Sequence, residues 1–430
     1  MTTVLVIVVF VAAYVLIATE RIHRVAAALS GAAGMVLLGV VDARVAFFSE
    51  RTGVDWNVIF LLLGMMVIVG VLRQTGVFEF LAIWGAKRAR GRPFLIMVML
   101  VVLTAVASAL LDNVTTVLLV APVTLLVCDQ IEAPPVPFLI AEVMASNIGG
   151  TATLIGDPPN IIIASKSGLT FNDFLVNLGP IVVLLLLVFL VMCRVMFRRA
   201  FTFHPERVEA LMALDAREAI ADPRLLAKSG LVLAAVLVGF VSHSFTGLEP
   251  SLVALLGAGA LVAVSDLDIT DAVADIEWPT LVFFMGLFVM VGALVEVGVV
   301  GSLAARATEA VDGHYFLASS VLLGASGVLS GIVDNIPYVA TMAPLVSDLV
   351  QAGNGAPGAN AAWWALALGA DLGGNATAVG ASANVVVLGI AARNGHPISF
   401  WTFTKYGLVV APVTIAVSWV YVALRYFVLA

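Results

Sequence analysis

Long, uninterrupted apolar runs recur along the whole chain of 430 residues, as in Val4–Ala18, Leu231–Val241 and Leu281–Val295. A membrane-spanning α-helix needs about 20 predominantly apolar residues. The runs do not alternate apolar with polar residues, which excludes a transmembrane β-barrel. Because 62% of the residues are hydrophobic and 11% are charged, a soluble enzyme, a singly anchored enzyme and a nucleic-acid-binding protein are also excluded. The sequence predicts an all-α polytopic membrane protein.

The apolar pattern divides into two halves separated by one long polar stretch, Arg198–Lys228. Candidate helical segments are residues 3–19, 25–41, 56–72, 93–111, 114–128, 136–164, 175–196, 229–246, 250–264, 278–296, 314–333, 336–350, 362–392 and 402–428. The chain starts Met-Thr-Thr-Val without a basic region, which favours a first transmembrane helix over a signal peptide. We therefore expect a first repeat at 1–197, a cytoplasmic linker at 198–228 and a second repeat at 229–430.

The two halves share residues of rarer types at nearly constant spacing. At an offset of 222, matches include Trp56 with Trp278, Gly64 with Gly286, Asp112-Asn113 with Asp334-Asn335 and Pro122 with Pro344. At an offset of 224, matches include Gly149-Gly150 with Gly373-Gly374, Thr153 with Thr377, Gly156 with Gly380 and Asn160 with Asn384. These matches indicate an internal duplication.

Basic residues predict the orientation of the chain, because Lys and Arg are retained on the cytoplasmic side. The run from Lys87 to Arg92 and the central linker would then be cytoplasmic, with the N-terminus outside. This arrangement requires 93–128 and 314–350 to be re-entrant hairpins, so that each half crosses the membrane five times. An odd number of crossings inverts the second repeat, and inverted repeats with broken helices are typical of secondary transporters.

Four segments break the apolar pattern at membrane depth, where polar backbone is tolerated against protein or water. Two are the hairpin tips, at 111–116 and 333–337, and two interrupt later helices, at 147–160 and 371–384. Glycine permits unwound backbone and proline prevents helical hydrogen bonding, so freed N–H and C=O groups can face a ligand.

Four aspartates lie in these breaks: Asp112, Asp334, Asp157 and Asp371. A charge at mid-membrane costs about 2.5–3.5 kcal/mol on insertion scales, so we expect these residues to bind the coupling ion. The coupling ion we expect is H⁺, with Na⁺ as an alternative. A competing interpretation is that an aspartate caps a half-helix, and for Asp157 the two interpretations are equally favoured.

Amide side chains form symmetric pairs in the same breaks, and an amide can both ligate a cation and donate to a substrate oxygen. The predicted substrate-binding residues are Asn113, Asn335, Asn160, Asn384, Gly150, Thr151, Gly374 and Thr377. The alternative is that the asparagines and threonines satisfy the broken backbone locally.

Catalytic and metal-binding signatures are absent from the sequence. Cys128 and Cys193 have no metal-ligand spacing, and no Walker A, His-Glu-x-x-His or Gly-x-Ser-x-Gly pattern occurs. We therefore expect no catalytic residue, no metal and no cofactor. An intramembrane hydrolase with Asp157 and Asp371 as an aspartyl pair, and a channel, are the alternatives from other classes.

On the residues of the tips, the Gly156-Asp157-Pro158-Pro159-Asn160 segment and the Asp371–Asn375 segment, the chain resembles the ion transporter superfamily. Within it, the chain is similar to the arsenite permease and sodium/proton antiporter branch. The resemblance implies an elevator-type transporter in the bacterial cytoplasmic (inner) membrane, with substrate and coupling ion held by the tips and unwound helices. It also implies two candidate partners, a second copy of the chain in a homodimer and a soluble arsenite-stimulated ATPase.

The charge of the four breaks ranks the substrates, because they contain acidic residues and no basic ones. A dicarboxylate or citrate would require arginine or several sodium ions. A neutral trihydroxy species such as arsenous acid requires hydrogen-bonding groups, with carboxylates free to carry protons. We therefore expect proton-coupled efflux of arsenite or antimonite, with sodium/proton antiport second and organic-anion symport third.

Overall fold

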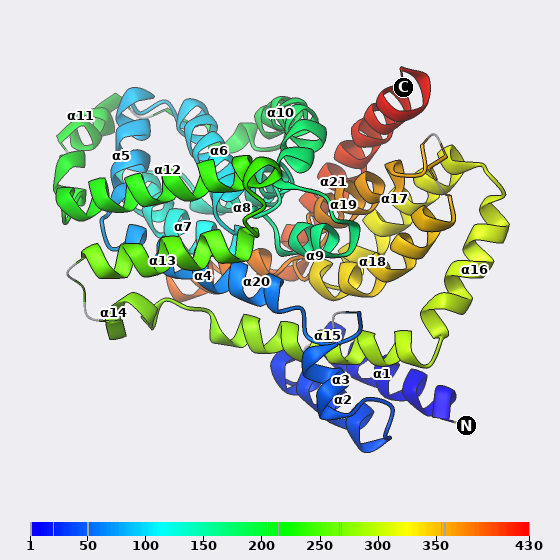
Figure 1. Cartoon of the computed structure of the whole chain (residues 1–430). Coiled ribbons are helices and arrows are strands. Elements are labelled where there is room, and N and C mark those ends of the chain that lie inside the picture. Colours follow the sequence, from blue (N-terminus) through cyan, green and yellow to red (C-terminus); the bar gives the residue numbers. More distant parts are fainter. Residues whose placement is uncertain are drawn as a thin grey trace.

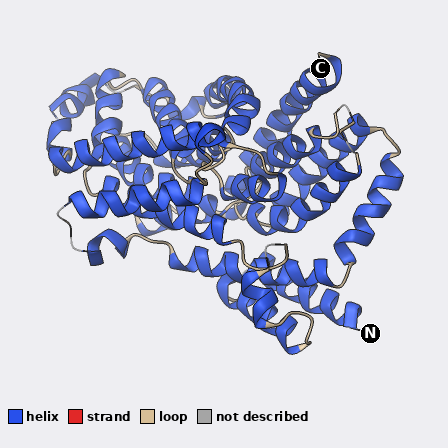
Figure 2. Cartoon of the chain, in the orientation of Figure 1, coloured by secondary structure: helices blue, strands red, loops and turns tan. Residues whose placement is uncertain are grey.

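The structure is a computed structural model that describes residues 2–19, 21–49, 51–203, 205–213, 215–265, 267, 269–353, 355–356 and 358–429. Every regular element in this part of the chain is helical (Figures 1 and 2). Within the same residues, 9 helices are long and apolar enough to cross a membrane. The predicted all-α membrane architecture is confirmed.

The described residues of the first half form ten α-helices, and a polar segment with short helices follows them. The first ten are α1 (Thr2–Thr19), α2 (Arg24–Leu37), α3 (Ala43–Phe48), α4 (Trp56–Arg73), α5 (Val77–Arg88), α6 (Pro93–Leu110), α7 (Asn113–Gln130), α8 (Pro135–Gly150), α9 (Pro158–Ser167) and α10 (Phe171–Met196). The polar segment contains η1 (Arg198–Ala200), α11 (Pro205–Ala213) and η2 (Ala216–Ala219).

The second half follows the same order of long and short helices. Its elements are α12 (Pro223–Thr246), α13 (Pro250–Ser265), α14 (Ile269–Ala274), α15 (Trp278–Glu296), α16 (Val299–Val311), α17 (Tyr315–Ile332), α18 (Asn335–Ala352), α19 (Ala361–Gly373), α20 (Ser382–Arg393), α21 (Phe400–Ala423) and η3 (Leu424–Val428). Helices α4, α6 and α7 begin at residues 56, 93 and 113, and α15, α17 and α18 begin 222 residues later, at 278, 315 and 335. The equal spacing supports the duplication, whereas inversion of the second copy stays a prediction.

Several helices differ from the segments expected from hydropathy. The segments 136–164 and 362–392 are each two helices, α8 with α9 and α19 with α20, separated by the predicted breaks. Helices α5 and α16 were not expected, because they are short and start after Gly76 and Gly298, both at a φ of 75°. Helix α12 begins at Pro223, so the last six residues of the expected linker belong to it.

Each hairpin is a pair of helices separated by one or two extended residues. Between α6 and α7, Leu111 and Asp112 have β-region backbone angles, and Asp112 is the N-cap of α7. Between α17 and α18, Val333 is extended and Asp334 is the N-cap of α18. Helix α7 packs on α20, and α18 packs on α9, so each hairpin contacts a broken helix of the other half.

Small residues let the broken helices approach the hairpins closely. A Cβ atom at Gly149 would lie 2.2 Å from the backbone oxygen of Ala105 on α6, and one at Gly373 would lie 2.5 Å from that of Gly327 on α17. Glycine is therefore required where α8 crosses α6 and where α19 crosses α17. These crossings fix the position of both unwound segments beside the hairpin tips.

The remaining helices exchange partners between the halves. Helix α4 of the first half packs on α12 and α13, and α15 of the second half packs on α1 and α2. In Figure 1, α1, α2 and α3 lie together beneath α15, away from α12 and α13. The hairpins and broken helices are thus flanked by a frame to which both halves contribute.

Candidate functional site

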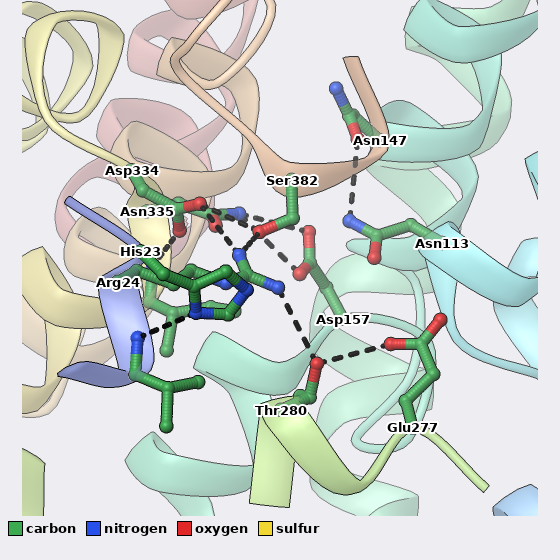
Figure 3. A network of polar contacts seen from close by, with 12 residues as sticks. His23, Arg24, Asn113, Asn147, Asp157, Glu277, Thr280, Asp334, Asn335 and Ser382 are labelled. Carbon is green, nitrogen blue, oxygen red and sulfur yellow. Dashed lines mark hydrogen bonds and ion pairs between the residues drawn. The ribbon is translucent and has the colours of Figure 1, made fainter. Parts of the chain in front are cut away.

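The four predicted breaks meet near the centre of the molecule, where side chains from both halves are hydrogen-bonded to one another (Figure 3). Asn113, at the first tip, donates to Asn147 Oδ1 of α8 at 3.3 Å. Asn335, at the second tip, donates to both carboxylate oxygens of Asp157, at 3.4 and 3.3 Å. All four side chains are buried. The structure therefore brings both tips and both unwound segments to one polar centre.

Asn147 connects the two halves at this centre. Its Nδ2 donates to Asn375 Oδ1 at 2.9 Å and to Asn384 Oδ1 at 3.1 Å, both beyond α19 in the second half. Asn375 in turn donates to the backbone oxygen of Met144 at 3.3 Å. The sequence analysis did not single out Asn147 or Asn375, although both lie in the predicted breaks. The 224-residue offset was the available signal, because it aligns Asn147 with Asp371 and Thr151 with Asn375.

Asn160 and Asn384 have matching roles in the two unwound segments. Asn160 Nδ2 donates to the backbone oxygens of Thr151 at 3.4 Å and Thr153 at 3.0 Å. Asn384 Nδ2 donates to those of Gly374 at 2.8 Å and Thr377 at 2.9 Å. Both amides satisfy carbonyl groups released by the helix breaks, which is the local bonding considered as the alternative to substrate binding.

The small residues predicted for substrate binding shape the backbone. Thr151 Oγ1 donates to the backbone oxygen of Asn147 at 2.9 Å, and Thr377 Oγ1 donates to that of Gly331 at 2.6 Å. A Cβ atom at Gly150 would lie 2.6 Å from Gly156 O, and one at Gly374 would lie 3.2 Å from Gly380 O. These residues therefore fix the backbone of the unwound segments through hydrogen bonds and close packing. Their contact with a substrate stays a prediction.

The two tip aspartates cap helices. Asp112 Oδ1 accepts from the backbone N–H of Thr115 at 2.8 Å, and its Oδ2 accepts from the Thr115 hydroxyl at 2.5 Å. Asp334 Oδ1 accepts from the backbone N–H of Ile336 at 3.0 Å. Both carboxylates are thus placed at helix N-termini, where the helix dipole favours negative charge.

Arg24, at the start of α2, adds a cation that the breaks themselves lack. Its guanidinium lies 3.7 Å from Asp334 Oδ2, donates to the Ser382 hydroxyl and donates to Thr280 Oγ1 at 3.4 Å (Figure 3). Ser382 donates to Asp334 Oδ2 at 2.7 Å. Sequence spacing offered no signal for this contact, because Arg24 is far from both tips along the chain and is brought in by the packing of α2 on α15.

Arg24, Asp334 and Ser382 also line a cavity of about 320 Å³. Its other walls are mostly apolar residues of α1, α15 and α20. Glu277, the residue before α15, lies near this network, because Thr280 Oγ1 donates to its carboxylate at 3.1 Å. Electrostatic interactions of Glu277 include both Asp112 and Arg24. Glu277 therefore adds a further carboxylate to the neighbourhood of Arg24.

Asp157 and Asp371 lie deeper than the tip aspartates, and both are fully buried. Asp157 precedes α9 but forms no capping hydrogen bond, and its carboxylate is instead bound by Asn335. Among the described residues, neither oxygen of Asp371 has a hydrogen-bond partner. Asp157 interacts electrostatically with Asp371, Asp334 and Asp112, so the predicted coupling residues form one acidic group.

Known proteins resemble this chain over nearly its full length. The family described as citrate transporter (CitMHS) matches residues 14–369. An uncharacterized transporter of Mycobacterium tuberculosis is 58% identical over 421 residues, 98% of each chain, and the 46 kDa membrane protein of Mycobacterium leprae is 54% identical over 428 residues, 100% of each. The P protein of Mus musculus is 33% identical, over 96% of this chain and 59% of that protein.

Among solved structures, the YdaH transporter of Alcanivorax borkumensis, whose crystal structure is described as having an unusual topology, matches 98% of both chains with a TM-score of 0.64 and 15% identity. At this identity the likeness shows a shared fold. Together with the sequence relatives, it confirms the expected membership of the ion transporter superfamily. The family match over residues 14–369 and the similarity to mycobacterial transporters show that the chain is a transporter, not an enzyme, and belongs to the citrate transporter (CitMHS) family.

Proposed function

We propose that this transporter is a secondary active exporter of arsenite, or antimonite, driven by proton entry. The observation that carries this proposal is the charge of the central network. It combines Asp112, Asp157, Asp334 and Asp371 with one guanidinium, that of Arg24, which already lies 3.7 Å from Asp334. Carboxylates in surplus favour protons or metal cations as the coupling species and disfavour an anionic solute.

Hydrogen-bonding groups support a neutral solute. Amides of Asn113, Asn147 and Asn335 adjoin carboxylates and other amides, and an amide both donates and accepts. Arsenous acid carries three hydroxyl groups and no charge near neutral pH, so its recognition needs no arginine. The protons exchanged for it would be carried by the same acidic group, which gives the antiport a physical basis.

Two other substrates, citrate and Na⁺, are each favoured by one observation. The description of the family as citrate transporter favours citrate, whose carboxylates would have to draw Arg24 away from Asp334. The acidic group by itself favours sodium/proton antiport, in which Na⁺ replaces protons at the carboxylates. A homodimer, a soluble ATPase partner, an inner-membrane location with the N-terminus outside, and the elevator motion stay predictions.

Transport by the purified protein in proteoliposomes tests the proposal. With an acidic lumen, an arsenite/proton antiporter accumulates arsenite and releases protons. One-for-one exchange moves one charge per cycle, so with the membrane potential held at zero by a potassium ionophore it gives about tenfold accumulation per pH unit. Citrate and Na⁺ are tested in parallel under the same gradient. Accumulation of citrate without arsenite, or proton movement that requires Na⁺ and ignores arsenite, would reject arsenite export in favour of the corresponding alternative.

A further inference from the structure

The central amide network is built twice, once from each unwound segment, but with different chemistry. The 224-residue offset aligns Asn147 with Asp371, Asn384 with Asn160, and Asn375 with Thr151. In one copy, Asn147 Nδ2 donates to Asn384 Oδ1 at 3.1 Å. In the other copy, a carboxylate stands where that amide donor would be.

The copy with the carboxylate is incomplete. The Thr151 hydroxyl and the Asn160 amide face Asp371 and favour its charged form. Neither forms a hydrogen bond of normal geometry with it, because both Asp371 oxygens and Asn160 Oδ1 are buried without a hydrogen-bond partner among the described residues. The neighbouring donors are engaged elsewhere, because Thr151 Oγ1 donates to Asn147 O and Asn160 Nδ2 donates to Thr151 O and Thr153 O. By the 224-residue offset, Asp371 and Asn160 correspond to Asn147 and Asn384, where the Asn147 amide donates to Asn384 Oδ1. An ionised Asp371 has no proton to donate to Asn160 Oδ1 in the same way.

We propose that Asp371 and Asn160 form a buried proton-binding site, in which the protonated carboxyl group of Asp371 donates to Asn160 Oδ1. Proton uptake forms an O–H bond on Asp371 and makes the site neutral, and proton release restores the carboxylate. The O–H group then takes the place that the Asn147 amide has in the other copy. This inference rests on the proposed proton-coupled function for what the proton drives, but not for the existence of the site.

The same argument does not apply to the tip aspartates. Asp112 accepts two hydrogen bonds from Thr115, and Asp334 accepts from Ile336 N–H and Ser382 beside Arg24. Both tip carboxylates therefore have hydrogen-bond donors in this structure, whereas neither oxygen of Asp371 has one among the described residues, and burial of an unpaired carboxylate is costly. Of the four aspartates predicted to bind the coupling ion, Asp371 is thus the one whose carboxylate lacks a hydrogen-bond donor.

Among the titratable groups on the helices around Asp371, Asp157 is the acidic neighbour, because the others are bonded elsewhere or lie at a distance. Asp157, before α9, interacts electrostatically with Asp371. On α8, Glu142 accepts from Thr124, and on α18, Tyr338 is bonded to Ser326. Lys166 lies in the last turn of α9, at the end away from Asp157, and Lys405 of α21 is exposed. A second carboxylate nearby further disfavours a charge on Asp371.

Infrared spectroscopy and transport of three purified variants test the site. The wild type should show carbonyl absorption from buried protonated carboxyl groups, and the difference spectrum of Asp371→Asn should lack one band, that of Asp371. The variant should remain folded, because its amide can donate to Asn160 Oδ1 as Asn147 does to Asn384. Asp371→Asn should also lose the approximately tenfold arsenite accumulation per pH unit. The double variant Asn147→Asp with Asp371→Asn exchanges the two groups and should regain both the band and the accumulation. Asp275→Asn, which removes a partly exposed carboxylate, should change neither.

Three results would overturn the proposal. The first is an Asp371→Asn variant that keeps the band and the coupling. The second is a folded double variant that remains uncoupled. The third is loss of the wild-type band when Na⁺ is added at constant pH, which would identify a metal cation in place of the proton. Failure of the wild type to move arsenite would count against the proposed function alone, since the infrared measurement requires no solute.

Discussion

The asparagines at the centre of the molecule are not equivalent. Asn113 forms one side-chain hydrogen bond, to Asn147 at 3.3 Å. Asn384 holds two carbonyl groups of the unwound segment after α19 and also accepts from Asn147. At the hairpin tip, asparagine therefore bonds to another side chain. At the helix break, it bonds to backbone carbonyl groups that the helix no longer pairs.

Replacement of these two asparagines by alanine should have different effects: Asn384→Ala should lower the stability of the protein, and Asn113→Ala should abolish transport without lowering it. Asn384→Ala leaves the Gly374 and Thr377 carbonyls without that donor, at a cost of about 1–3 kcal/mol for each buried group. Asn113→Ala removes one long hydrogen bond, so its thermal unfolding in detergent should stay close to that of the wild type while transport is lost. Equal melting temperatures for the two variants would contradict this division, and normal transport by Asn113→Ala would remove it from the site.

Local signals predicted most of the elements, because each break is marked by residues that act on their own backbone. Asp112 and Asp334 are the N-caps at which α7 and α18 begin, and Pro158 begins α9. The contact of Arg24 with Asp334 could not be predicted, since it depends on the packing of one half against the other. The lack of hydrogen-bond partners at the Asp371 oxygens could not be predicted either, because it depends on Thr151 and Asn160 donating to backbone oxygens of the unwound segment.

Arg24→Gln tests whether the contact between α2 and the second hairpin matters for transport. The change leaves Asp334 without its charged partner and removes the hydrogen bonds that the guanidinium donates to Ser382 and Thr280. A hydrogen bond to a charged group is worth about 1.5–3 kcal/mol, so we expect a transport rate lowered roughly tenfold. Arg73→Gln is the matched control, because Arg73 pairs with Asp275 at 3.0 Å on a more exposed surface, where ion pairs contribute little. Equal activity of both variants would show that the Arg24 contact is dispensable.

The crossing of α8 and α6 predicts a steric effect at Gly149. Gly149→Ala would place a Cβ atom 2.2 Å from Ala105 O, so the helices must separate, at a cost of about 1–3 kcal/mol or more. Gly230→Ala is the control, since a Cβ atom there has nothing within 4 Å. Thermal unfolding should occur at a clearly lower temperature for Gly149→Ala alone, and a shared melting temperature would argue against the close crossing.

At the scale of the whole molecule, the predicted inversion of the repeats places equivalent loops on opposite sides of the membrane. Arg90 follows α5 and Asp312 follows α16, 222 residues apart, and both have left-handed backbone, with φ of 51° and 42°. Both side chains are exposed. This pair of loops is thus suited to a measurement of sidedness.

Cysteine labelling of intact cells should report this topology. A membrane-impermeant thiol reagent should label Asp312→Cys from outside and Arg90→Cys only after the membrane is opened. The native Cys128 and Cys193 are buried and should give little background. Labelling of both positions from the same side would reject the inverted arrangement.

The exchange of partners between the halves has a consequence for how the protein is made. Helix α2 packs on α15, which the ribosome produces only after the first half and the linker are complete, and α4 similarly awaits α13. In the finished protein the face of α2 around Ala28 and Gly31 packs so closely on α15 that a Cβ atom at Gly31 would meet Met290. Until α15 is synthesised, that face has no protein partner in the bilayer. During synthesis that face is open to any insertase or neighbouring chain, and two nascent copies can complete each other by trading halves.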